Sequence, residues 1–197
     1  MTVMAERAPQ VTVDEFEQIA KAAEKLADDA VRFEFIDGRI GVKGMPDGDH
    51  AEIVAWLQRR CMQSAGLWLY AGGELGLRVE QYRQGRARPD AVLAAEGTFA
   101  GQGDWADPDG VLMTVEVTSY DSDTDRRDRQ EKPSSYAATG IPYFLLIDRD
   151  AGTVTLYSDP GPDGYRDAHS VKFGATLSLP EPIGIELDTE RLKDHVR

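Results

Sequence analysis

Two acidic residues stand beside apolar segments in the middle of the chain. Asp90 directly precedes the apolar residues 91–93, and Glu116 interrupts the apolar segment 111–117. An ionised carboxylate in such a buried strand is costly unless it is paired, hydrogen-bonded or bound to a metal ion. Mg²⁺ and Mn²⁺ prefer oxygen ligands, and one or two carboxylates can hold them together with phosphate oxygens and water. The pair therefore predicts a divalent-cation site that handles phosphate esters.

Lys132 follows these two acids at the expected start of a helix. A bound metal ion lowers the pKa of a coordinated water and offsets the negative charge that develops on phosphorus. Lys132 would orient that water or stabilise the same charge. Each residue also has a structural interpretation: Glu116 paired with an arginine, Asp90 at a strand start, and Lys132 on the surface. Their placement on strands and before a helix is the main reason to favour chemistry.

Patterns in the first part of the chain predict the elements around a further acid, Glu34. Residues 11–27 have helical spacing and begin with a capping box at Thr12. Residues 31–42 alternate between apolar and polar types around Asp37-Gly38, which is a strong turn signal. These residues predict a β-hairpin that carries Glu34 on one strand. The alternation also allows Glu34 to face solvent.

The rest of the chain reads as strands connected by two helices. A helix is expected from His50 to about Ser64 with Asp49 as its cap, and His50 more often helps to cap a helix than binds a metal. A second helix is expected to end at Thr139, with Gly140 as its left-handed cap. The expected strands are 67–70, 76–81, 89–94, 111–118, 143–147, 153–158, 170–173 and 183–187. The second helix would join two of these strands as a right-handed crossover.

The composition limits the class of protein. The 197 residues are enough for one domain over 1–197, with residues 1–10 expected to be loosely ordered. The single cysteine, Cys61, excludes an internal disulfide, fits a reducing compartment and reads as a buried thiol. No run approaches the roughly 18 apolar residues of a membrane span, and the N-terminus has no apolar signal core. We expect a cytoplasmic protein.

The net charge of −13, from 22 basic and 35 acidic residues, is unusual for a nucleic-acid-binding protein. Two groups of basic residues could still form a local patch. They are Arg83, Arg86 and Arg88, and then Arg126, Arg127, Arg129 and Lys132. Equally, both groups could be solvated loop charges.

Several short motifs occur in an order that resembles a known family. They are Phe33-Glu34-Phe35-Ile36-Asp37-Gly38, His50, Arg88-Pro89-Asp90, Val115-Glu116-Val117-Thr118-Ser119, Arg127-Asp128-x-x-Glu131-Lys132-x-x-x-Tyr136, Gly140-Ile141-Pro142 and Leu146-Ile147-Asp148. In combination they resemble the Uma-type family of putative restriction endonucleases, which belongs to the PD-(D/E)XK nuclease superfamily. The resemblance covers nearly the whole chain, from Val11 to Leu192.

The resemblance implies a restriction-endonuclease-like fold and cleavage of phosphodiester bonds with Mg²⁺ or Mn²⁺. It implies that Asp90 and Glu116 are metal ligands and that Glu34 is an additional acid near the site. The lysine of the superfamily motif is displaced, because Thr118 stands two positions after Glu116. Lys132 on the following helix would substitute for it. Tyr136, one turn later on that helix, is expected to be a packing residue.

Together these observations predict an α/β fold with a mixed central sheet flanked by helices and a hairpin-rich C-terminal part. The expected function is a metal-dependent nuclease that acts on DNA, with catalytic residues Asp90, Glu116, Lys132 and Glu34. Nucleic-acid contacts are expected from Arg88, Arg127 and Arg129, and a homodimer is a further expectation, because many nucleases dimerise to cut two strands. The alternative is a non-catalytic binding or assembly module that acts through protein partners, which the acidic charge favours.

Overall fold

The structure is a computed structural model that describes residues 11–27, 31–43, 45–64, 66–80, 84–119 and 126–196. The expected loose order of residues 1–10 and the position of Arg83 lie outside these ranges. Within them, no helix has the length and the apolar composition needed to cross a membrane.

A six-stranded mixed sheet forms the centre of the fold, in the order β11-β10-β9-β8-β6-β3. Its strands are β3 (Leu67–Ala71), β6 (Ala91–Ala95), β8 (Val111–Val117), β9 (Tyr143–Asp148), β10 (Thr153–Gly161) and β11 (Gly164–Lys172). β8 and β9 are parallel, whereas the other neighbours are antiparallel. Because α4 (Lys132–Ala138) lies between β8 and β9 in the chain, the expected strand–helix–strand crossover is confirmed.

A second, five-stranded sheet has the order β2-β1-β5-β4-β7. Its strands are β1 (Arg32–Ile36), β2 (Arg39–Lys43), β4 (Gly76–Glu80), β5 (Gln84–Ala87) and β7 (Trp105–Ala106). The predicted hairpin is confirmed: Asp37 and Gly38 have φ angles of 51° and 75°, as the tight turn requires. Strand β5 was not predicted, because Arg86 was read as part of a basic group that forms either a local patch or solvated loop charges. In fact Arg86 is buried, and its guanidinium pairs with Glu17 at 2.6 Å.

The C-terminal part is rich in hairpins, as expected. The β10–β11 hairpin is followed by a two-stranded sheet of β12 (Thr176–Leu179) and β13 (Ile185–Asp188). The strand expected at 170–173 is the end of β11, and β12 was not predicted. A 3-10 helix, Glu190–His195, ends the described chain.

The capping signals that the sequence predicts are present in two helices and displaced in a third. α1 (Val13–Leu26) starts with the expected capping box at Thr12. α4 ends at Ala138, one residue before the predicted end, and the expected left-handed Gly140 has a φ angle of 84°. The cap of α2 (Gly48–Cys61) is Asp47 and not Asp49. The Asp47 carboxylate accepts a hydrogen bond from the His50 N–H at 2.7 Å, and it also pairs with Arg149 from the far end of β9. The helix also ends earlier than predicted, at Cys61.

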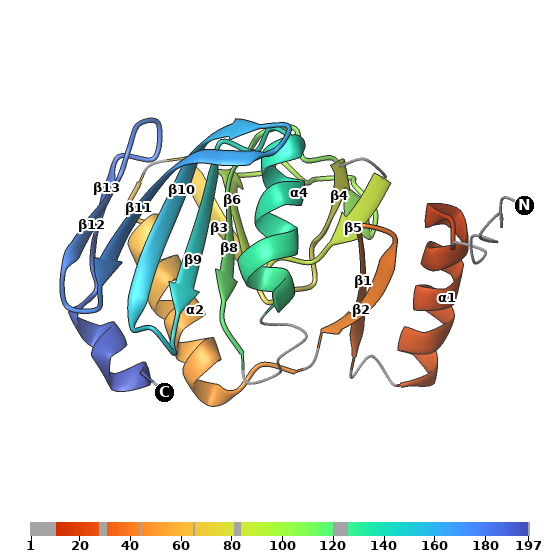
Figure 1. Ribbon diagram of the computed structural model, residues 1–197, viewed down its shortest axis with the longest axis horizontal. Helices are drawn as coiled ribbons and strands as arrows, with labels where there is room; N and C mark the ends of the chain where they lie inside the picture. The colour runs from red at the N-terminus through yellow and green to blue at the C-terminus, as the bar shows by residue number, and fades with distance from the viewer. Residues whose placement is uncertain are drawn as a thin grey trace, which may run out of the picture.

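Helices cover the two faces of the six-stranded sheet. In Figure 1, α2 lies behind this sheet, α4 lies in front of it, and α1 packs at the outer side of the five-stranded sheet. The larger hydrophobic core lies on the α2 side and includes the buried Met113, Val115 and Val117 of β8. Side chains alternate along a strand, so Glu116 points to the opposite face, towards α4. A carboxylate is thereby placed in the space between the two sheets.

Candidate active site

Backbone hydrogen bonds fix Asp90 beside the end of β8. The Asp90 N–H donates to the Val115 carbonyl at 3.0 Å, and the Asp90 Oδ2 accepts from the Val117 N–H at 2.7 Å. Asp90 directly precedes β6, which is antiparallel to β8, so the start of one strand meets the end of the other. The structure therefore brings Asp90 and Glu116 together, as the apolar patterns around them predict.

Lys43, the last residue of β2, connects the two carboxylates. Its Nζ lies 2.8 Å from Asp90 Oδ1, 3.4 Å from Glu116 Oε2 and 2.6 Å from the Arg88 carbonyl oxygen. Sequence reasoning missed this lysine. A signal existed: Glu34 pairs with Gly41 in the hairpin, and Lys43, two residues on, lies on the same face.

Lys132 is fully buried and contacts three further carboxylate oxygens. Its Nζ lies 3.0 Å from both Glu34 Oε1 and Glu116 Oε1, and 2.9 Å from Asp128 Oδ1. Three of the four predicted catalytic residues thus meet here, and the fourth, Asp90, joins them through Lys43. We call Glu34, Lys43, Asp90, Glu116, Asp128 and Lys132 the carboxylate–lysine cluster.

An unusual helix start places Lys132. Residues Arg127–Glu131 form a π-helical turn that continues directly into α4, and the Lys132 N–H donates to the Arg127 carbonyl. Pro133 has no N–H, but it lies at the start of α4, where a proline is tolerated. Lys132 was expected at the start of a helix, and it is the first residue of α4.

Two neighbours hold the acids of the cluster from outside. The Tyr136 hydroxyl donates to Glu116 Oε1 at 2.8 Å, and its ring packs against Phe144. Tyr136 is therefore a packing residue, as predicted, and also a hydrogen-bond donor. The His50 Nε2 lies 3.0 Å from Asp90 Oδ2, while its backbone N–H is the group that Asp47 caps. His50 is thus at the site.

Two acids of the cluster, Asp90 and Glu34, have lowered pKa values. Burial alone would raise the pKa of Asp90, but the attraction of Lys43 and His50 outweighs it and holds this pKa well below its usual range. Burial also opposes ionisation of Glu34. Attraction by Lys132 and Lys43, together with the hydrogen bond from the Arg88 N–H, lowers the pKa of Glu34 nevertheless.

The two remaining acids hold their protons more tightly. Burial raises the pKa of Glu116 to about 8, against the attraction of Lys132 and Lys43. Burial likewise raises the pKa of Asp128, which Lys132 only partly offsets. Four carboxyl groups share two lysine ammonium groups, so the cluster has more acidic groups than cations to pair with them.

The predicted nucleic-acid-binding arginines lie in internal ion pairs. Arg88 is buried, stacks on Trp105 at 4.3 Å and approaches Glu24 at 3.4 Å. Arg127 is buried, donates to the Val42 carbonyl at 2.7 Å and lies 3.7 Å from Glu34.

Arg129 is partly exposed, with 27% of its side chain accessible, and pairs with Asp148 and Asp150. Any of the three would have to share or leave these partners to bind a phosphate, so their role in nucleic-acid binding stays a prediction.

Three oxygens at this site could hold a divalent cation. Asp90 Oδ1, Glu116 Oε2 and the Arg88 carbonyl converge on one point, now the position of the Lys43 ammonium. Within the described ranges, no three acidic, histidine or cysteine side chains form a metal cage. Mg²⁺ does not need such a cage, because water and substrate phosphates complete its octahedron. Because the cluster has more carboxyl groups than lysines, the positive charge of a divalent cation would be favourable there.

The fold is that of a nuclease-like α/β protein, and its buried acids lie where strands of the two sheets approach each other. The chain belongs to the Uma2 family, described as a putative restriction endonuclease family, whose pattern matches residues 13–190. The fold is similar to the crystal structure of a putative nuclease belonging to DUF820 from Anabaena variabilis ATCC 29413, with a TM-score of 0.67 and 19% identity. That similarity covers 93% of this chain and 98% of the other. No curated protein matches the sequence.

Proposed function

We propose that this protein is a metal-dependent endonuclease that hydrolyses phosphodiester bonds in DNA. The observation that carries the proposal is the convergence of Asp90 Oδ1, Glu116 Oε2 and the Arg88 carbonyl on one cation position. Family membership supports the reaction class. The DNA substrate and the use of Mg²⁺ or Mn²⁺ are parts of the proposal.

Each member of the cluster has a role in this proposal. Asp90 and Glu116 would hold the metal, which would supply a Lewis acid for the phosphate and an acidified water. Tyr136 and Lys132 orient Glu116 through its Oε1, which leaves Oε2 for the metal. Glu34 and Asp128 hold the Lys132 ammonium 3.0 and 2.9 Å away and keep it charged. Lys132 would then stabilise negative charge at the reacting phosphate.

Cleavage assays test the proposal. The full chain should cut supercoiled plasmid or single-stranded DNA with Mg²⁺ or Mn²⁺, and chelation should stop it. Asp90→Asn should abolish both cleavage and metal binding, whereas Lys132→Ala should keep metal binding and lower turnover by roughly 10²–10³. Equal activity in wild type and Asp90→Asn would indicate a contaminating nuclease and contradict the proposal.

A second candidate is a nuclease fold kept as a non-catalytic binding or assembly module. The observation in its favour is that Asp90 and Glu116 are only 4% and 0% exposed and are both paired with lysines. The net charge of −13 would suit a basic protein partner. This function predicts that calorimetry detects no metal binding and that no nucleic acid is cut.

A further inference from the structure

The side chain of Lys43 fills the point at which the proposed metal ligands converge. An ammonium group has three N–H donors. Lys43 has three oxygen neighbours to accept them, at 2.6 Å from Arg88, 2.8 Å from Asp90 and 3.4 Å from Glu116. These are the same three oxygens that fit a divalent cation. The position is therefore already filled by a monovalent cation that belongs to the chain.

The ammonium and a metal ion cannot occupy this position together. Mg²⁺ binds its oxygen ligands at 2.0–2.1 Å. An ion held by Asp90 and Glu116 would lie against the Lys43 ammonium, with no room for a water between them and with strong repulsion between the charges.

We infer that Lys43 is an internal competitor of the divalent cation: it occupies the metal position in the metal-free protein and must leave before the metal binds. The inference rests on the proposed metal site. The position of Lys43 would have two effects on the protein. The lysine holds Asp90 and Glu116 together without a metal, and it weakens the apparent affinity for the metal, because only the open state can bind it.

The two lysines of the cluster differ in how easily they can leave. Lys43 ends β2, which is an edge strand, and 13% of its side chain is exposed. Lys132 is fully buried between three carboxylates. A flexible four-carbon stem lets the Lys43 ammonium swing towards solvent. The bound metal would then replace the Lys43 ammonium as the cation beside both Asp90 and Glu116.

Metal-binding calorimetry on the full chain tests the inference. Lys43→Met keeps the length of the side chain and removes its charge. It should bind Mn²⁺ at least about tenfold more tightly than wild type, if the open state of wild type is populated at about 10% or less.

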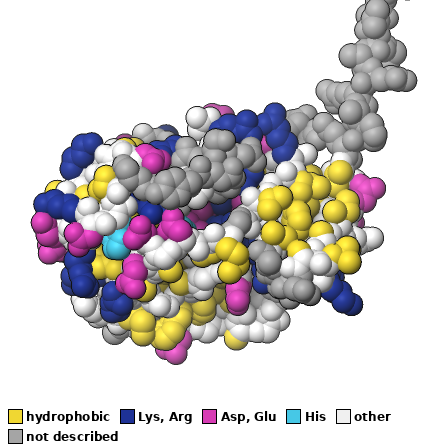
Figure 2. Space-filling model, turned by 90° about the horizontal axis from the view of Figure 1, so that it is seen from below, with side chains coloured by type: hydrophobic (Ala, Val, Ile, Leu, Met, Phe, Trp, Pro, Cys, Tyr) yellow, Lys and Arg dark blue, Asp and Glu magenta, His cyan; other side chains and the backbone are white. Residues whose placement is uncertain are grey.

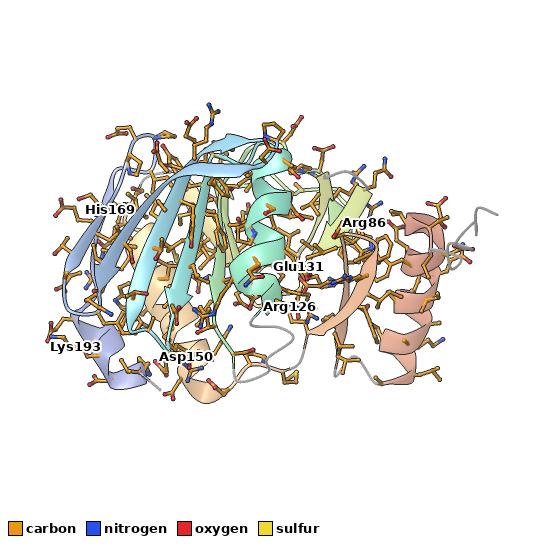
Figure 3. The ribbon with its side chains drawn as sticks, viewed as in Figure 1. Arg86, Arg126, Glu131, Asp150, His169 and Lys193 are labelled. Atoms are coloured by element: carbon orange, nitrogen blue, oxygen red, sulfur yellow. The ribbon has the colours of Figure 1, made fainter. Side chains whose placement is uncertain are left out.

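The matched control is Lys193→Met, which makes the same charge change at an exposed lysine of the C-terminal 3-10 helix, away from α4 (Figure 3). It should bind Mn²⁺ like wild type. Thermal melts should show a larger Mn²⁺-induced rise in Tm for Lys43→Met than for wild type.

Amine labelling with mass spectrometry gives a second readout that needs no variant. Saturating Mg²⁺ should increase the labelling of Lys43 in wild type and leave the buried Lys132 protected. Labelling of Lys43 that stays constant or falls would overturn the inference, as would equal or weaker Mn²⁺ binding by Lys43→Met.

Failure of the inference and failure of the proposed function give different results. Wild type that binds Mn²⁺, loses it on Glu116→Gln, and gains nothing from Lys43→Met refutes the competition and leaves the metal site intact. Absence of Mn²⁺ binding in both wild type and Lys43→Met refutes the two together.

Discussion

At the residue scale, the carboxylate–lysine cluster buries charged groups whose removal from water opposes folding. Removing a carboxylate or an ammonium from water costs several kcal/mol, and only close pairing offsets this cost. Glu116 and Lys132 are both fully buried, 3.0 Å apart. Such groups are usually retained for specificity or chemistry rather than for stability.

The first prediction concerns Glu116, whose pKa burial raises from 4.5 to about 8. The folded protein binds more protons than the unfolded chain between these values. The contribution of Glu116 to stability is therefore complete below the unfolded pKa and is lost as pH rises through the folded one.

In metal-free buffer, the free energy of unfolding of wild type should fall relative to Glu116→Gln as pH rises across this window. The slope should be at most about 1.4 kcal/mol per pH unit. Urea denaturation at a series of pH values measures it. The lowered pKa values of Asp90 and Glu34 act only at lower pH, where their contributions are lost as pH falls. If the difference in free energy of unfolding between wild type and Glu116→Gln does not change with pH, the prediction is contradicted.

The second prediction concerns Lys132. Lys132→Met leaves Glu34, Glu116 and Asp128 buried without their shared ammonium, and it should lower the free energy of unfolding by about 3–5 kcal/mol. Urea denaturation in the presence of a chelator measures this. Adding Asp128→Asn should recover part of the loss, because one buried acid is removed.

Lys193→Met is the control for Lys132→Met, because Lys193 forms an exposed pair with Glu190. Its cost should stay below about 1 kcal/mol. Equal losses in the two variants would show that the burial of Lys132 does not matter.

At the element scale, the N-terminus of α2 positions His50 against Asp90. Asp47 caps this helix and also pairs with Arg149, which is almost completely buried after the end of β9. Burial opposes ionisation of Asp47, but its hydrogen bonds from His50 and Arg149 lower its pKa. The strand and the helix are thus held together directly beside the site.

The third prediction compares Asp47→Ala with Asp49→Ala. Asp47→Ala removes the cap and the main partner of the buried Arg149, and it should lower the free energy of unfolding by about 1–3 kcal/mol. Asp49 is 55% exposed and lies 3.3 Å from Arg149, so its loss should cost less than about 1 kcal/mol. Chemical denaturation of both variants measures the two costs and shows which aspartate caps α2. A larger cost for Asp49→Ala would mean that Asp49 is the cap after all.

A close approach between β2 and the π-helical turn also supports the site. A Cβ atom on Gly41 would lie 2.7 Å from the guanidinium of Arg127. A larger residue at this position would push the Arg127 guanidinium away from its place beside Glu34. The close approach explains why a glycine stands in the interior of a strand that otherwise favours larger residues.

At the scale of the whole molecule, charge is the main obstacle to nucleic-acid binding. Exposed basic residues near the site include Arg39 and Arg126, whose side chains are 66% and 50% exposed and approach Glu131 at 3.7 and 3.4 Å. Figure 3 shows Arg126 and Glu131 together at the lower end of α4. These two arginines are the ones that we predict to contact phosphates, because at least half of each side chain is exposed.

The fourth prediction follows from this placement. Binding to DNA should be weak and steeply salt-dependent, because pairing of basic side chains with phosphates releases counterions. Arg39→Gln or Arg126→Gln should weaken binding for all sequences alike, and the log–log salt slope should become shallower by about 0.9 for each phosphate that the variant no longer neutralises. Fluorescence anisotropy with chelator present measures binding without cleavage.

The control for these variants is Arg166→Gln, in the β10–β11 hairpin, where Arg166 is 67% exposed and pairs with Asp159. It should leave the slope unchanged. Binding that ignores salt would contradict the prediction. Charge reversal at Arg127 would be a poorer test, because it places a carboxylate against Glu34.

The homodimer stays a prediction, and the structure suggests where to test it. The exposed large hydrophobic residues include Ile19 and Leu26 of α1 and Ile40 and Val42 of β2. Figure 2 shows hydrophobic side chains gathered on the side of the molecule where α1 lies. Sedimentation of wild type would show whether a dimer forms.

The sequence by itself determined the features that depend on neighbouring residues. The capping box at Thr12, the turn at Asp37-Gly38 and the helix end at Gly140 are local, so propensity and hydrogen bonding within a few residues specify them. Asp90 and Glu116 were also visible, because a charged residue beside an apolar strand contrasts with its neighbours.

Only the tertiary structure decided which distant groups pair. Lys43 reaches Glu116 across 73 positions, and Arg149 selects Asp47 as the cap across 102 positions. Local spacing carries no information on such pairs, because two sheets and a crossover helix must first pack. Burial then strengthens electrostatic attraction and excludes water, so which acids ionise and which cation lies between them are properties of the assembled fold.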